Sequence, residues 1–224
     1  MQSNLEKIEL TDKPFYTIQG EGKYIGEPTL FIRFWGCNLH CEWCDTKYSW
    51  QTRENTYLCT LEQLIQEIQE YPTKIIVITG GEPILRKNTI AKLATTLPEY
   101  TFQIETNGTL NIGDLIHLPN IHYVVSPKLA SSGNTHIYTT EIINQYKQQG
   151  ATWKFVCAED TLAEILQFIA EFTLPKNSIY LMPRGTTVEE ILSNSKHLWE
   201  YALQNGLKLT TRLHTLIFGN ERSI

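Results

Sequence analysis

The sequence predicts an α/β fold with mostly parallel strands, and two observations lead to this prediction. Short runs rich in β-branched and aromatic residues alternate with longer segments that carry the apolar periodicity of helices. The short runs are also apolar on both faces, as expected for strands that helices cover. Strands that alternate with helices pair in parallel through right-handed crossovers, which gives an open sheet or a partial barrel.

The elements can be placed by their composition. The expected strands are TLFIRFWG (29–36), KIIVITG (74–80), TFQIETN (101–107), HYVVSP (122–127), TWKFVCA (152–158), SIYLMP (178–183) and LKLTTRLH (207–214). The expected helices between them are 60–71, 88–97, 139–149, 161–172 and 187–205. Thr60 and Thr161 occupy N-cap positions, while Gly150 and Gly206 follow helices as C-terminal stops.

Bulk properties limit the possible functions. A chain of 224 residues is short enough to form one domain, which we expect to span 1–224. Its composition, with 42% hydrophobic and 19% charged residues, is typical of a globular protein. The net charge of -5 argues against non-specific nucleic-acid binding, which needs a basic surface. No apolar run reaches the ~18 residues of a membrane span. The charged N-terminus lacks a signal-peptide pattern, so we expect a cytoplasmic protein without disulfides.

Three of the five cysteines form a motif. GCNLHCEWCDT places Cys37, Cys41 and Cys44 in a C-x3-C-x2-C arrangement directly after the first expected strand. Three thiolates on one loop can hold three irons of a [4Fe–4S] cluster and leave the fourth iron without a protein ligand. A substrate or cofactor can bind at such an open metal position. A zinc loop is the alternative, with His40 or Asp45 as a further ligand.

Function in α/β folds gathers at the carboxyl ends of the strands, and three such ends carry polar motifs. In TGGEP (79–83), Gly80 and Gly81 allow close approach to a ligand, and Glu82 offers an acceptor for an ammonium group. SPK (126–128) supplies a hydroxyl and an ammonium group. MPRG (182–185) ends a later strand as a candidate adenine contact, with a plain Pro–Gly turn as the alternative.

The cysteine spacing, with aromatic Trp43 before the last cysteine, resembles the radical S-adenosylmethionine (SAM) superfamily. The resemblance implies an abbreviated partial (β/α) barrel in which the methionine moiety of SAM chelates the open iron. Electron transfer from the reduced cluster then yields a 5′-deoxyadenosyl radical that abstracts a substrate hydrogen. The SAM contacts that the resemblance implies are Gly81, Glu82, Ser126, Pro127, Lys128, Met182 and Pro183.

The segment FYTIQGEGKYIGEPTLFIRFWGCNLHCEWCDT further resembles the 7-carboxy-7-deazaguanine synthase family, through its QGEG leader, F-x-R strand and CDT. The match continues through TGGEP and SPK to RLHTLIFGNERSI, nearly the whole chain. It implies a carbon–nitrogen lyase that contracts 6-carboxy-5,6,7,8-tetrahydropterin to 7-carboxy-7-deazaguanine with release of ammonia, toward 7-deazapurines such as queuosine. It also implies a homodimer, and a flavodoxin or ferredoxin is the expected reductant.

The same resemblance assigns residues to the pterin and to Mg²⁺. The turn at Ile18, Gln19 and Gly20 would read pterin edges with backbone groups. Glu21 would accept from pterin N–H groups, and the planar fork of Arg33 suits a carboxylate. Thr79 would contact substrate, and the Thr46 hydroxyl would bind a Mg²⁺ that also touches the substrate carboxylate.

Two other functions compete with this interpretation. A glycyl-radical-enzyme activase shares the cysteine spacing and acts on a partner protein, but it should lack the QGEG leader and CDT. A non-catalytic Fe–S electron carrier explains neither three cysteines without a fourth nor the GGEP and SPK strand ends.

Overall fold

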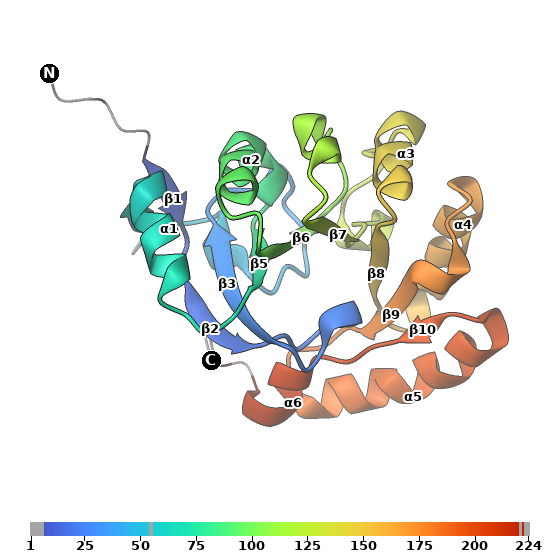
Figure 1. The fold of residues 1–224 in the computed structure, drawn as a ribbon. Helices are drawn as coiled ribbons and strands as arrows, with labels where there is room; N and C mark the ends of the chain where they lie inside the picture. Colours follow the sequence, from blue (N-terminus) through green and yellow to red (C-terminus); the bar gives the residue numbers. More distant parts are fainter. Residues whose placement is uncertain (1–6, 54–55, 220, 222–224) are drawn as a thin grey trace, which may run out of the picture.

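The computed structural model describes residues 7–53, 56–219 and 221. Within them, one mixed sheet contains seven neighbouring parallel strands, in the same order in space as in sequence. These strands are β3 (Pro28–Phe34), β5 (Ile75–Gly80), β6 (Thr101–Thr106), β7 (Ile121–Val125), β8 (Thr152–Cys157), β9 (Ile179–Pro183) and β10 (Lys208–Leu209). The sheet curves into an open barrel with helices around its convex side (Figure 1).

The crossovers contain the five helices that the sequence predicts. They are α1 (Leu61–Gln69), α2 (Lys87–Thr96), α3 (Thr140–Gln148), α4 (Leu162–Glu171) and α5 (Val188–Asn205). Thr60 caps α1 by accepting from the Gln63 N–H, and Gly206 ends α5 in the left-handed conformation. Thr161 precedes α4, but its hydroxyl bonds to Ala158 in place of capping the helix. The β6–β7 crossover carries a short 3-10 helix, Gly113–His117.

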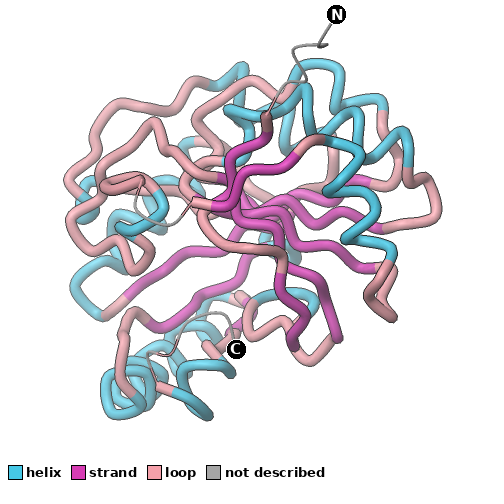
Figure 2. The backbone as a smooth tube through the Cα atoms, turned by 90° about the vertical axis from the view of Figure 1, so that its left-hand side faces the viewer, coloured by secondary structure: helices cyan, strands magenta, loops and turns pink. Residues whose placement is uncertain are grey.

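Three antiparallel strands extend the sheet beyond the sequence prediction. β1 (Ile8–Leu10) pairs with both β3 and β4 (Tyr57–Cys59), and β2 (Phe15–Ile18) pairs with the other part of β3. They cover the β3 edge of the parallel core, and Figure 2 shows the strands gathered inside with helices and loops around them. The first strand of a partial barrel would otherwise expose unpaired backbone groups.

The expected strand at 207–214 is wrong over most of its length. β10 ends at Leu209, and a short helix, α6 (Leu213–Phe218), begins four residues later. The chain leaves the sheet because it packs on the QGEG segment: Leu213 N donates to Gly20 O at 2.9 Å, and Gly22 N donates to the Thr210 hydroxyl at 2.9 Å. This departure carries Arg212 toward the centre of the barrel.

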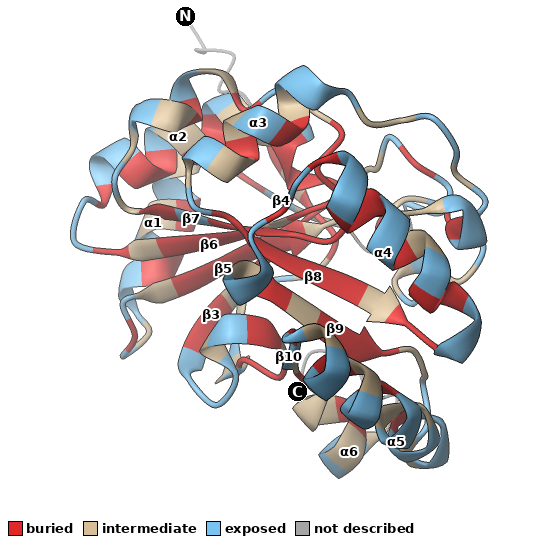
Figure 3. Cartoon of the chain, turned by 90° about the vertical axis from the view of Figure 1, so that its right-hand side faces the viewer, coloured by how far each residue is buried: buried red, intermediate tan, exposed pale blue. Residues whose placement is uncertain are grey.

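The core lies between the convex face of the sheet and the helices. Figure 3 shows that buried residues, coloured red, make up most of the strands. Trp153 of β8 and Phe102 of β6 are fully buried there, and Cys59 and Cys157 are buried as small hydrophobes. Among the described residues, no helix has both the length and the apolar character that a membrane span requires. The concave face and the carboxyl ends of the strands remain for the functional site.

Candidate functional site

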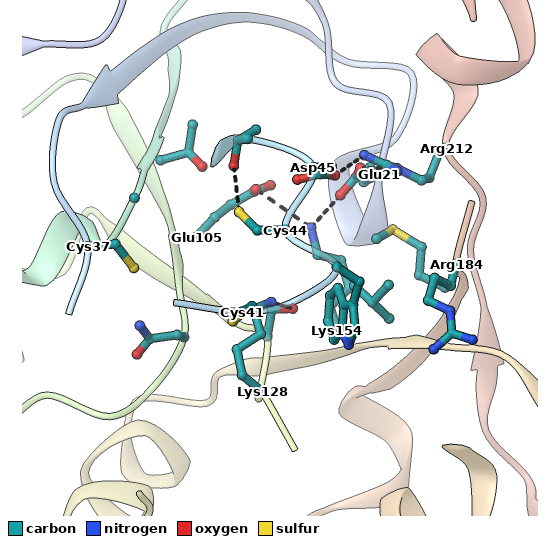
Figure 4. A pocket seen from close by; sticks show the side chains of 18 of the residues that line it. Glu21, Cys37, Cys41, Cys44, Asp45, Glu105, Lys128, Lys154, Arg184 and Arg212 are labelled. Carbon is teal, nitrogen blue, oxygen red and sulfur yellow. Dashed lines mark hydrogen bonds and ion pairs between the residues drawn. The ribbon is translucent and has the colours of Figure 1, made fainter. Parts of the chain in front are cut away.

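A cavity of about 600 Å³ opens at the carboxyl ends of the parallel strands. The cysteine loop forms one wall, and strand ends from β3 to β9 form the others (Figure 4). Its volume is in the range of small-molecule sites. All three motif cysteines line it, as do Thr46, Thr79, Gly81, Ser126, Lys128 and Met182.

The cysteine loop is closed at its base. Gly36 has φ of +100° and donates its N–H to Ser49 O at 2.8 Å, while the Ser49 hydroxyl donates to Thr46 O at 2.7 Å. Burial raises the pKa of the Cys37 thiol to about 11 and also raises the pKa of Cys41. Three thiols therefore face one cavity from one loop, a donor set that fits an iron–sulfur cluster bound at three irons.

The two glycines of TGGEP allow β5 to end against the cysteine loop. A Cβ on Gly81 would lie 2.1 Å from Gly36 O, and a Cβ on Gly80 would lie 2.0 Å from Phe34 O. Gly81 N donates to Phe34 O at 3.2 Å, and Glu82 N donates to Gly36 O at 2.8 Å. The motif thus joins two strand ends and leaves backbone, without side chains, at the cavity wall.

Glu82 lies behind this wall. Its side chain is buried, and its carboxylate accepts from Ile84 N at 3.0 Å, from the Thr106 hydroxyl at 2.7 Å and from Asn107 N at 2.7 Å. Burial raises the pKa of Glu82 despite these hydrogen bonds. The structure therefore gives Glu82 three donors within the protein and does not place it among the residues that line the cavity.

At the SPK and MPRG strand ends, too, some residues line the cavity and others do not. Lys128 donates to the Ser126 hydroxyl at 2.9 Å, and both line the cavity. Burial lowers the pKa of Lys128. Met182 also lines the cavity, whereas Pro127 and Pro183 do not.

A buried network of ion pairs also lines the cavity. Lys154 Nζ, with 4% of its side chain exposed, lies 2.6 Å from Glu21 Oε2 and 3.6 Å from Glu105 Oε2. Arg212 Nε lies 3.1 Å from Glu21 Oε1, and its guanidinium also bonds to Asp45 (Figure 4). Burial alone would raise the pKa of Glu21, but the Lys154 and Arg212 charges hold it well below its usual value.

The QGEG segment contributes to the network unevenly. Glu21 lines the cavity, whereas Ile18, Gln19 and Gly20 do not. Gln19 is buried and donates to Glu105 Oε1 at 3.1 Å, while its own Oε1 accepts from Glu21 N at 3.1 Å. Ile18 ends β2 and is exposed. Gln19 therefore orients two cavity carboxylates from behind.

Arg33 projects from β3 into the cavity, as strand alternation predicts. Its Nε is buried without a hydrogen bond, 3.9 Å from Asp12 Oδ2, and its guanidinium lies 5.9 Å from the Tyr48 ring centroid. A buried guanidinium nitrogen without an acceptor is costly, which makes Arg33 a suitable partner for an anionic ligand group.

The zinc alternative has little geometric support. The His40 ring packs edge-on against the Trp50 indole, with the ring centroids 4.7 Å apart, and His40 does not line the cavity. Within the described residues, no three His, Cys, Asp or Glu side chains converge as they would around one ion. A cubane does not require such convergence, because each thiolate binds a different iron.

Sequence reasoning missed Lys154 and Arg212. Lys154 stands within TWKFVC, where a lysine in an otherwise apolar strand was an available signal. The sequence carries no such signal for Arg212. LKLTTRLH predicts a strand, and only the turn into α6 brings the Arg212 side chain to the cavity.

Comparisons with known proteins identify the chain. Residues 32–193 match the family model described as radical SAM superfamily. The 7-carboxy-7-deazaguanine synthase of Hyperthermus butylicus is 32% identical, over 91% of this chain and 90% of that protein. The 7-carboxy-7-deazaguanine synthase of Pyrobaculum aerophilum is 30% identical, over 93% of this chain and 94% of that protein. The crystal structure of QueE from Escherichia coli superposes with a TM-score of 0.73 at 27% identity, covering 93% of this chain and 95% of that one. The chain belongs to the 7-carboxy-7-deazaguanine synthase family of the radical SAM superfamily.

Proposed function

We propose that this chain contracts 6-carboxy-5,6,7,8-tetrahydropterin to 7-carboxy-7-deazaguanine with release of ammonia, as a radical SAM lyase of 7-deazapurine biosynthesis. One observation carries the proposal: a single cavity joins the three motif cysteines, the TGGEP and SPK strand ends and a set of buried charged groups. When bound, the [4Fe–4S] cluster and SAM supply a one-electron reduction and hydrogen abstraction. The protein holds both reactants and excludes water. The residues 1–224 would form one radical SAM domain.

The SAM site would lie between the cysteine loop and β5, β7 and β9. Gly81 offers close backbone approach, Ser126 a hydroxyl, Lys128 a cation for a carboxylate, and Met182 an apolar surface for adenine. Glu82, Pro127 and Pro183 would act by shaping these strand ends, because they do not line the cavity.

The pterin would occupy the end of the cavity bounded by Glu21, Arg33 and Thr79. Glu21 remains an anion beside Lys154 and Arg212, so it can accept hydrogen bonds from ring N–H groups. Arg33 would bind the substrate carboxylate through its guanidinium. Ile18, Gln19 and Gly20 would hold the Glu21 backbone in place.

Mg²⁺ would bind beside the cysteine loop. The Thr46 hydroxyl lies on the cavity wall, 3.7 Å from Cys44 Sγ, and Asp45 precedes it. A hydroxyl with substrate and water oxygens is a suitable ligand set for Mg²⁺. Thr46→Ala should weaken the Mg²⁺ activation of turnover while SAM binding is kept. An unchanged Mg²⁺ response would exclude Thr46 as its ligand.

A second copy of the chain would pack on α5 and α6. Exposed apolar side chains gather on these helices: Leu192, Trp199, Leu203, Ile217 and Phe218. Exposed Lys196 and Glu200, one helical turn apart, would pair across an antiparallel contact of two α5 helices. Trp199→Glu should shift the chain to a monomer in sedimentation. A dimer unchanged by it would place the interface elsewhere.

The activity is tested anaerobically with reconstituted protein, a flavodoxin or dithionite as reductant, SAM and the carboxypterin. The expected result is 7-carboxy-7-deazaguanine without net SAM consumption, and its loss in Cys44→Ala together with the cluster absorbance. SAM cleavage that needs a protein partner would indicate an activase, and the absence of any SAM cleavage an electron carrier. We further propose that the enzyme works in the cytoplasm, where such reductants are available.

A further inference from the structure

Each of the three motif cysteine sulfurs accepts a hydrogen bond from an N–H group. Leu39 N donates to Cys37 Sγ at 3.4 Å, Asn134 Nδ2 donates to Cys41 Sγ at 3.3 Å, and Trp50 Nε1 donates to Cys44 Sγ at 3.5 Å. The first donor is backbone, and the other two are side chains outside the C-x3-C-x2-C motif. The sulfurs thus receive directed N–H dipoles from three separate points of the chain.

The Trp50 donor is held by the base of the loop. A 3-10 turn, Lys47–Ser49, precedes it, and Trp50 N donates to Lys47 O at 3.1 Å. The His40 ring packs edge-on against the indole with ring centroids 4.7 Å apart. These contacts orient the indole N–H toward Cys44.

The Asn134 donor belongs to the segment that follows SPK and lies against the cysteine loop. Glu42 N donates to Ser132 O at 3.1 Å, and Trp43 Nε1 donates to Ser131 O at 2.9 Å. Asn134 Nδ2 is also within 2.9 Å of the buried Ser132 hydroxyl. The β7 end therefore brings a sulfur donor to the middle cysteine across 93 residues of sequence.

We propose that Asn134 and Trp50 are positioning residues that raise the reduction potential of the bound cluster, an inference that rests on the proposed function. Reduction of the +2 cluster by one electron from a flavodoxin or dithionite increases the negative charge on its sulfur ligands. N–H dipoles aimed at those sulfurs stabilise the reduced +1 state more than the oxidised state. The effect eases reduction by the donor and limits the driving force that the cluster then delivers to the SAM sulfonium.

The chain offers a clean substitution and a matched control. Trp50→Phe removes the sulfur donor and keeps an aromatic ring against His40. Trp35→Phe removes an indole N–H next to the same loop whose acceptor, at 3.2 Å, is the Thr52 carbonyl and not a sulfur. Asn134→Leu keeps the size of the side chain but also loses the bonds to Ser132, so it serves as the second variant.

The measurement is an EPR-monitored redox titration of the reconstituted full chain, without SAM, on samples matched for iron and sulfide content. We expect Trp50→Phe and Asn134→Leu each to shift the midpoint potential to more negative values, the double variant to shift it further, and Trp35→Phe to leave it unchanged. Equal midpoints for Trp50→Phe and wild type, or an equal shift in Trp35→Phe, would overturn the proposal. If both donor variants lose the cluster, the side chains act in assembly and the tuning role is refuted. A wild-type chain that binds no cluster would instead refute the proposed function.

Discussion

The substitution Lys154→Met tests the buried network directly, because it removes the cation between two cavity carboxylates and keeps a side chain of similar length. Lys154 Nζ is 2.6 Å from Glu21 and 3.6 Å from Glu105, and 4% of its side chain is exposed. Removing one partner of a buried ion pair costs about 3–5 kcal/mol. Arg212 still contacts Glu21 at 3.1 Å, so we expect the lower end, about 3 kcal/mol.

The assay is urea unfolding of the full chain without cluster and with its thiols reduced, at several pH values. With an m-value of about 3 kcal/mol per M, a loss of about 3 kcal/mol lowers the midpoint by about 1 M urea. Lys147→Met is the control, because Lys147 Nζ donates to the Phe172 carbonyl at 2.8 Å and its loss should cost only about 1 kcal/mol. If Lys154→Met and Lys147→Met lose equal free energy of unfolding at pH 7, the Lys154 ion pairs do not stabilise the fold as expected.

The pH dependence of this loss has a defined sign. The folded-state pKa of Glu21 lies below its unfolded value of about 4.3, so its contribution is present above that pH and disappears as the pH falls toward the folded value. The folded-state pKa of Lys154 is raised, so its contribution is present below about 10.4 and is lost as the pH rises through the folded value. The difference between wild type and Lys154→Met should therefore be largest between these limits and smaller at pH 4 than at pH 7.

Other substitutions test how the site is built. Gly81→Ala places a Cβ 2.1 Å from Gly36 O, a backbone atom with little room to move, so we expect the loss of cluster assembly, measured as iron per chain. Glu82→Gln leaves one of three donors facing an amide NH₂, which should lower stability by about 2–3 kcal/mol in thermal unfolding. Thr60→Ala removes an exposed capping box remote from the cavity and should cost about 1 kcal/mol with cluster content unchanged. Normal cluster loading in Gly81→Ala, neutral stability in Glu82→Gln or cluster loss in Thr60→Ala would each contradict this account.

The parallel part of the fold was predictable because burial on both faces leaves a local signature. KIIVITG and TFQIET are apolar runs that become β5 and β6, and α1, which precedes β5, carries a capping box and an apolar stripe. The rule that function gathers at the carboxyl ends of parallel strands then pointed to Gly81, Ser126 and Met182, which do line the cavity.

The antiparallel strands left no comparable signature. β1 and β4 are three residues each, and Ile8 pairs with Cys59 across some fifty residues, so no turn between them marks a hairpin. The environment of Glu82 in the site is likewise not predictable from the sequence. An acidic residue after two glycines indicates a ligand contact, but the sequence does not reveal that three donors from β6 and its own turn already occupy the carboxylate.

The cysteine loop cannot be stable by itself, and this links cluster binding to completion of the fold. The Asn38 amide donates to the Thr109 hydroxyl at 2.8 Å and accepts from Asn107 at 2.9 Å, both beyond the end of β6. Further along the loop, Trp43 bonds to the segment after β7, and Asp45 bonds to Arg212 at the far end of the chain. Each of these contacts requires a strand end formed later in the sequence, so the entropy of ordering the loop is offset only when the sheet is assembled. A chain whose β10–α6 junction is loosened should therefore lose affinity for the cluster even though all three thiols remain.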